Sequence, residues 1–233
     1  MKKNVIFKLF LLAVGFIAIS AVIFLISHSL NNFKITDNKV VILEEEEEGR
    51  VSNINVIDFS SVDRFNKKLV KAAIKQTKKS VIYDPSYFPI DYPNGDIPEN
   101  KGVCTDVIIR AYRLVDIDLQ EKVHQDMKEN FHLYPQKWGL NSPDTNIDHR
   151  RVPNLQVFFS RFGIKLKTSK NPKDYKPGDI VTWDLGQGKT HIGIVTNHYQ
   201  NNIPLIVHNI SRGPQLENML FKFEITGHYR YKD

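Results

Sequence analysis

Cys104 is the single cysteine of this 233-residue chain, and it stands at the beginning of a predicted helix. Apolar residues at helical spacing follow it, among them Val107, Ile108 and Ala111. A thiol at a helix N-terminus meets unpaired backbone N–H groups and the positive end of the helix dipole, and both favour the thiolate. We therefore expect Cys104 to be a nucleophile with a lowered pKa. The alternative is a small buried hydrophobic residue, the usual role of a free cysteine.

His191 and His208 lie in two β-rich segments that are separated by the turn-forming run 200–202. If the two segments form a hairpin, the histidines come nearly opposite each other, with Cβ atoms about 5 Å apart. A cysteine that begins a helix, a histidine on a strand and a polar residue on the next strand form the arrangement of a cysteine hydrolase. In it His191 accepts the thiol proton and His208 orients the imidazole. The pattern thus predicts a Cys104-His191-His208 triad.

The predicted elements that position these residues are mainly helices before residue 163 and strands after it. Helices are expected from Ser60 or Ser61 to about Lys79, from Cys104 onward and over 154–162, with a short strand at 81–83. Strands are expected at 179–183, 191–195, 204–208, 221–225 and 229–231. Helices followed by antiparallel strands predict an α+β fold. Residues 121–153 read as a polar, aromatic, loop-rich insert, and ordered loops of such length are usually functional or cover something.

The N-terminus carries the targeting signal. Three lysines precede Leu9–Ser27, a run without charge that is long enough to cross a bilayer as one helix. Basic residues ahead of it favour a cytoplasmic N-terminus and an extracytoplasmic body. We expect a retained single-pass anchor in the cell membrane, because the run is longer than the usual core of a signal peptide. If it is a cleaved signal instead, the protein is secreted.

Three regions are expected: the anchor or signal at 1–30, a flexible acidic linker at 31–57 and one hydrolase domain at 58–233. The linker contains the run Glu44–Glu48, whose like charges repel and favour solvation. The net charge of +6 is compatible with acidic polymers such as cell-wall glycans, and no nucleic-acid partner is expected. One cysteine excludes an intrachain disulfide. Zinc is the alternative for a histidine-rich site, but no tight ligand spacing such as HExxH occurs, so neither metal nor cofactor is expected.

Several stretches carry a resemblance to known families. Residues 177–183, 191–195 and 206–208 resemble the core of the NlpC-type cell-wall hydrolases, a branch of the papain-like cysteine peptidases. More closely, the chain resembles the domain-of-unknown-function family numbered 1287 over about residues 65–233. The stretches that match it are Tyr83-Asp84-Pro85, Asp91-Tyr92-Pro93, Gly102-Val103-Cys104-Thr105-Asp106, residues 148–154, His208-Asn209-Ile210 and residues 226–231.

The resemblance implies a papain-like NlpC-type fold, in which the nucleophile helix packs on an antiparallel sheet. It implies the same triad, with Cys104, His191 and His208 in the family's order, and hydrolysis of an amide bond in cell-wall peptides. The chain departs from the better-known hydrolases at Val103-Cys104-Thr105, where those usually carry Asp-Cys-Ser, and in its insert at 121–153. These departures leave the substrate open. The alternatives are acyl or peptidyl transfer by the same triad and a non-catalytic module that binds the cell wall.

Other residues are candidates for substrate or oxyanion binding. Tyr83 resembles a tyrosine that lies near the nucleophile in some relatives and donates to an oxyanion, and a plain core tyrosine is the alternative. Asp106 is placed to stabilise the helix start. His149, Arg150 and Arg151 follow Asp148 in a cluster, and arginine forks match carboxylates and phosphates. The alternative for this cluster is a surface or intrachain salt-bridge cluster.

Overall fold

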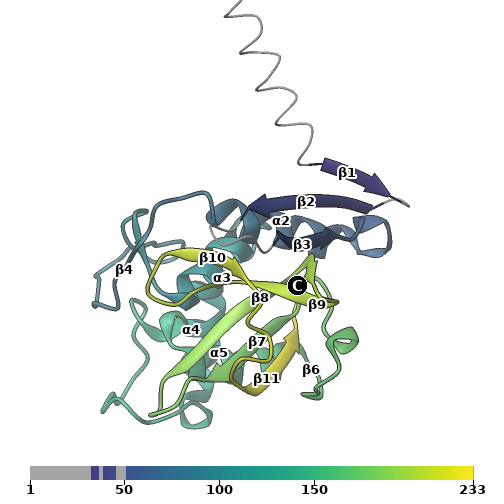
Figure 1. Ribbon diagram of the computed structural model, residues 1–233. Helices are drawn as coiled ribbons and strands as arrows, with labels where there is room; N and C mark the ends of the chain where they lie inside the picture. Colours follow the sequence, from purple (N-terminus) through teal and green to yellow (C-terminus); the bar gives the residue numbers. More distant parts are fainter. Residues whose placement is uncertain (1–32, 37–38, 46–50, 233) are drawn as a thin grey trace, which may run out of the picture. The chain divides into compact units, whose positions relative to one another are not determined.

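The computed structural model describes residues 33–36, 39–45 and 51–232, and the chain divides into two units, Met1–Ile57 and Asp58–Asp233 (Figure 1). The first unit contains three antiparallel strands, β1 (Phe33–Thr36), β2 (Lys39–Glu45) and β3 (Val51–Val56). Part of the predicted linker therefore has regular secondary structure, because valine and isoleucine are frequent in β2 and β3. The predicted anchor, Leu9–Ser27, lies outside the described residues. In the part that is described, no helix is long and apolar enough to cross a membrane.

Four α-helices of the second unit carry or support the site. They are α2 (Arg64–Gln76), α3 (Cys104–Arg113), α4 (Leu119–Asn130) and α5 (Val152–Phe162). Helix α2 begins later than predicted, because the Asp63 side chain rather than Ser60 or Ser61 accepts hydrogen bonds from the first free N–H groups. Short 3₁₀ helices connect the elements: η1 (Phe59–Ser61), η2 (Phe131–Leu133), η3 (Asp148–Arg150) and η4 (Pro172–Asp174).

The insert at 121–153 is less loop-like than predicted. Its first part belongs to α4, which is capped by the Asp118 carboxylate at the Gln120 N–H. Leu119, Val123 and Met127 are spaced four residues apart and are all buried, so they form the apolar face of an ordinary amphipathic helix. The high density of charges around them obscured this pattern in the sequence.

The main sheet of the second unit is antiparallel, with the order β10-β9-β8-β7-β11-β6. Its strands are β6 (Ile164–Lys165), β7 (Ile180–Asp184), β8 (Thr190–Gln200), β9 (Ile203–Asn209), β10 (Pro214–Glu217) and β11 (Glu224–Arg230). A separate parallel pair joins β4 (Ile82–Tyr83) to β5 (Lys101–Gly102). The predicted combination of helices with an antiparallel sheet is confirmed, although one strand, β11, replaces the two predicted at 221–225 and 229–231.

Alternating side chains of the sheet enter two separate cores. Ile180, Ile192 and Ile194 face the helices and join the larger core, which α3 and α5 cover (Figure 1). On β7, the residues that alternate with this face, Val181 and Trp183, face the other side of the sheet. They pack with Tyr175, Met219 and Leu220. The period of two along a strand produces this division. Because α3 packs against β8 and β9, the helix that Cys104 begins lies beside the strands that carry the histidines.

Candidate active site

The start of α3 is held by a buried ion pair. The Asp106 carboxylate accepts a hydrogen bond from the Val103 N–H at 2.7 Å, closing the first turn of the helix. Arg150 donates two further hydrogen bonds to the same carboxylate, at 2.9 and 3.1 Å, and both side chains are buried. Asp106 and Arg150 therefore neutralise each other in an intrachain salt bridge, the alternative that the sequence had left open for this cluster. This pair fixes the turn from which the Cys104 side chain projects.

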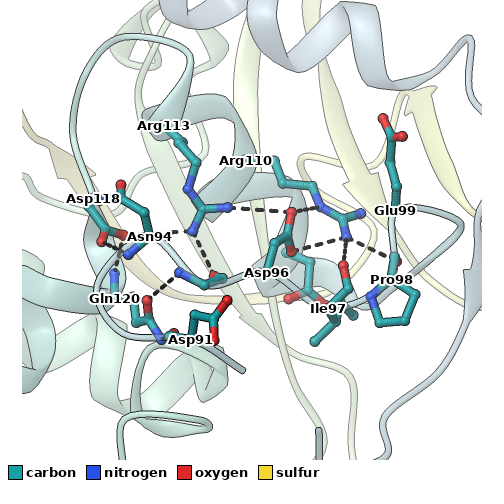
Figure 2. A network of polar contacts seen from close by, with 12 residues as sticks. Asp91, Asn94, Asp96, Ile97, Pro98, Glu99, Arg110, Arg113, Asp118 and Gln120 are labelled. Atoms are coloured by element: carbon teal, nitrogen blue, oxygen red, sulfur yellow. Dashed lines mark hydrogen bonds and ion pairs between the residues drawn. The ribbon is translucent and has the colours of Figure 1, made fainter. Parts of the chain in front are cut away.

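The loop that leads to Cys104 is fastened to α3 by two arginines of that helix (Figure 2). Arg110 binds the Asp96 carboxylate with two N–H groups, at 2.9 and 3.1 Å, and donates to the Lys101 carbonyl at 2.9 Å. Arg113 donates to the Gly95 carbonyl, also at 2.9 Å. Both arginines belong to the helix that Cys104 begins. Their contacts therefore fix the path of the loop that leads to the cysteine.

Gly102, two residues before the cysteine, connects three parts of the site. Its strand β5 pairs with β4, which sets Tyr83 beside Gly102. Its carbonyl accepts a hydrogen bond from the Asn209 side chain at 3.1 Å. Asn209 directly follows His208, so this bond ties the end of β9 to the segment that presents Cys104. The Tyr83 ring is partly exposed, and burial together with the nearby Cys104 and Asp106 raises its pKa.

The two histidines are hydrogen-bonded to each other. His191 Nε2 and His208 Nδ1 lie 3.0 Å apart, the ring planes are nearly perpendicular at 89°, and both residues are buried. Ile194 pairs with Val207, so the register places Gly193 opposite His208, and His191 is the diagonal neighbour. This differs from the nearly opposite placement expected from the sequence.

The position of the turn explains the difference. The turn falls at Asn201 and Asn202, whose φ angles are 52° and 62°, and the shift of register between Val195 and Tyr199 brings the histidines back only as far as a diagonal placement. These positive φ values suit asparagine in a two-residue hairpin turn. Gly193 then leaves space for the diagonal contact, because a Cβ there would lie 3.2 Å from His208 Cβ and 2.5 Å from Ile206 Cγ2.

A carboxylate that the sequence analysis missed lies behind the histidines. His208 Nε2 is 3.2 Å from Glu217 Oε2, and Arg212 donates to the other Glu217 oxygen at 3.1 Å. An ionised carboxylate only accepts, so His208 Nε2 carries hydrogen and His208 Nδ1 accepts from His191 Nε2. The hydrogen of the neutral His191 ring is then on Nε2, and its Nδ1 has a free lone pair. Glu217 is on β10, a strand that no pattern in the sequence had indicated.

Burial keeps the cysteine and histidines neutral at rest. It raises the pKa of the Cys104 thiol to about 12, although the backbone N–H groups of Ile192, Thr105 and Cys104 itself act in the opposite direction. The lowered pKa expected from the sequence is therefore wrong, because the loss of water outweighs the helix N-terminus. Burial likewise lowers the pKa of His191 to about 3 and that of His208 to about 4. The Ile192 N–H group, which lowers the pKa of the thiol, belongs to the residue that follows His191. The thiol therefore lies beside the beginning of β8.

A cleft of about 330 Å³ opens at Cys104. Its lining includes Tyr83, Lys137, Trp138, Arg151 and Thr190. The insert between α4 and α5 therefore supplies one wall, including two residues that the sequence analysis had not singled out, Lys137 and Trp138. Arg150 also reaches this lining, although its guanidinium is bound to Asp106.

His149 does not join the other candidates. It is buried, and burial lowers its pKa to about 3. Its Nδ1 atom has no hydrogen-bond partner among the residues that the structure describes, and the residue does not line the cleft. Of the four residues in the 148–151 cluster, Arg151 alone combines a place in the cleft with a guanidinium that Asp106 does not bind.

The fold and the site define a mixed protein of helices and an antiparallel sheet with a buried cysteine and a histidine pair. Residues 70–231 match a family described as a domain of unknown function, DUF1287, and this chain belongs to that family. The resemblance to the family numbered 1287, predicted from the sequence, is thus confirmed.

The proteins similar to the chain include a relative in sequence and a solved structure. Over 167 residues it is 50% identical to a protein of Escherichia coli (strain K12) called "Uncharacterized protein YijF", a match that covers 71% of this chain and 82% of the relative. It is also similar to the crystal structure of an N-acetylmuramoyl-L-alanine amidase from Bacteroides uniformis ATCC 8492, at 15% identity and a TM-score of 0.43, over 73% of this chain and 100% of that one. A structural likeness at this level carries no argument about activity.

Proposed function

We propose that the domain is a cysteine hydrolase that cleaves an amide bond, with Cys104 as nucleophile, His191 as base and His208 as the residue that orients it. The observation that carries this proposal is the hydrogen-bonded histidine pair, whose His191 adjoins the Ile192 N–H that acts on the thiol of Cys104, a residue that lines the cleft. A nucleophile, a base and a third group that fixes the base form the common pattern of covalent hydrolysis. Within the proposal, the NlpC-type papain-like architecture is the fold that holds them.

The charges of the site favour proton transfer during the attack over a preformed ion pair. The thiol is protonated at rest and His191 is neutral, with its Nδ1 lone pair free to accept. As the sulfur attacks the carbonyl carbon, the thiol proton passes to His191. His191 then gives the proton to the departing amine as the C–N bond breaks and a thioester forms. Water, deprotonated by His191, cleaves the thioester and releases the carboxylic acid and the free thiol.

Two groups are placed to stabilise the negative oxygen of the tetrahedral intermediate. The first N–H groups of α3 have no partner within the helix and point to its N-terminal side. Tyr83 lines the same cleft, and its raised pKa keeps the hydroxyl protonated and able to donate. In this proposal Tyr83 therefore acts on the oxyanion, and Asp106 and Arg150 act by holding the helix start.

Cell-wall peptides are the proposed substrate class, on the strength of the resemblance to NlpC-type hydrolases. The proposed location, outside the cytoplasm behind the anchor at Leu9–Ser27, gives access to such peptides. A reporter fused after Asp233 tests the location: it should be active only if it works outside the cytoplasm. Activity of a reporter that requires the cytoplasm would contradict the proposal.

The activity is tested with the purified full chain and fragments of peptidoglycan. Mass spectrometry should detect new amino and carboxyl termini, and Cys104→Ala and His191→Ala should abolish them. Lys170→Gln, a change of an exposed side chain, is the matched control. If added amines are incorporated into the products, the enzyme is a transferase. If the Cys104→Ala protein and the unmodified chain both bind the fragments and neither cleaves them, the domain is a wall-binding module and the proposal fails.

A further inference from the structure

One wall of the cleft carries a stacked pair of side chains, Arg151 and Trp138. The Arg151 guanidinium lies over the Trp138 ring, 4.0 Å from its centroid. This stacking orders the planar group while leaving its N–H edges free to donate. In the part of the chain that the structure describes, the Arg151 side chain makes no ion pair and no hydrogen bond, whereas its backbone carbonyl accepts from the Asn154 and Leu155 N–H groups of α5. Its neighbour Arg150, by contrast, donates to the Asp106 carboxylate and to the Ser86 carbonyl.

The charge balance of the cleft is positive. Lys137 lines it together with Arg151, and no aspartate or glutamate is among the described lining residues. Asp144 and Asp148 act on the Arg151 charge from outside the lining, but burial has the larger effect and lowers its pKa. A half-buried cation without a direct partner is costly, and an anion in the cleft would remove that cost.

A second hollow continues the cleft along the same wall. Its volume is about 500 Å³, and it shares Lys137, Pro153 and Thr190 with the lining around Cys104. Lys137 thus lies where the two hollows meet, and Arg151 lines the hollow that contains Cys104. An extended substrate has room on both sides of Lys137.

We propose that the cleft selects substrates with a free carboxylate close to the scissile amide, and that Arg151, ordered by Trp138, binds this carboxylate. The inference rests on the proposed function and names its substrate class. A guanidinium fork matches a carboxylate with two parallel hydrogen bonds, whereas Lys137 supplies a point charge. Arg151 is accordingly a specificity residue, and it takes no part in the proton transfers.

Binding and turnover are measured separately, so that failure of this inference differs from failure of the hydrolase proposal. The probes are cell-wall peptides with free carboxylates and the same peptides with these groups converted to carboxamides. Binding is followed on the inactive Cys104→Ala full chain by calorimetry and by tryptophan fluorescence. Trp138 is partly exposed in the cleft while Trp183 is fully buried, so the fluorescence change reports on the stacked pair.

We expect the carboxylate peptides to bind about 10- to 100-fold more tightly than the carboxamides, the range of a charge-assisted hydrogen bond. Arg151→Gln should remove this preference, Arg151→Lys should restore part of it, and the charge-matched control Lys170→Gln should retain it. In the active chain the same factor should appear in kcat/KM. Equal binding of both peptides, or a preference that survives Arg151→Gln, overturns the inference even if hydrolysis occurs. Stronger competition by inorganic phosphate than by acetate overturns the carboxylate assignment.

Discussion

The protonated state of Cys104 leads to a quantitative prediction about alkylation. At pH 7.5 a thiol with a pKa of about 12 has about 3,000-fold less thiolate than a free thiol with a pKa of about 8.5. A more basic thiolate is also more nucleophilic, and a Brønsted coefficient of about 0.4–0.5 raises the rate constant of the thiolate by a factor of about 30. Iodoacetamide should therefore modify Cys104 about 100-fold more slowly in the folded protein than in the same protein unfolded in guanidinium.

The assay is mass spectrometry of the full chain alkylated between pH 6 and pH 10, with the unfolded chain as its own reference. The rate should rise about tenfold per pH unit over this range, because the pH stays well below the pKa of the thiol. His191→Ala should leave the rate at pH 7.5 nearly unchanged, since no resting ion pair exists to be lost. A plateau below pH 8, or alkylation faster than in the unfolded chain, would refute the reasoning and restore the lowered pKa expected from the sequence.

Three further predictions concern the histidine pair. Since folding lowers the pKa of His191 to about 3 from about 6.5, its stabilising effect is complete above pH 6.5 and is lost as the pH falls toward 3. In urea unfolding, the share of His191 in the stability lost between pH 7.5 and pH 5 should be about 2 kcal/mol, and His191→Gln should reduce the total loss by this amount. His208 and His149, whose pKa values burial also lowers, should keep their own shares. Gly193→Ala should destabilise the fold by about 1–3 kcal/mol in the same assay, because the new Cβ meets Ile206 at 2.5 Å, and unchanged stability would show that the hairpin yields easily. Glu217→Ala should lower kcat about tenfold with little effect on KM, and Glu217→Gln should be milder because its amide oxygen still accepts from His208; equal effects of the two would contradict the tautomer argument.

The elements around the site were predictable to the extent that their signals are local. The helix after Cys104 and the strands with His191 and His208 follow from periodicity, and their residues are buried as that periodicity requires. The diagonal placement of the histidines was not predictable, because it depends on a shift of register within β8. Glu217 was missed for a related reason: it reaches His208 only through the pairing of β10 with β9.

The thiol pKa shows a different limit of sequence reasoning. A helix N-terminus is a local feature, and its effect on Cys104 could be argued from neighbouring residues. Desolvation depends on what packs against the thiol from distant parts of the chain, here the strand that contains Ile192. Likewise, Arg150 and Arg151 are adjacent and chemically identical, and only the fold directs one to Asp106 and the other to Trp138.

The wall of the cleft is fixed at both of its ends, and this makes the segment between them a natural site for protein engineering. At one end the Tyr134 hydroxyl donates to Asp126 at 2.6 Å, and at the other the Asp106–Arg150 pair holds η3 against α3. Residues 135–143 run between these anchor points and carry Lys137 and Trp138. Segments of other lengths and compositions could be grafted there to redirect the choice of ligand, while the turn that presents Cys104 keeps its support.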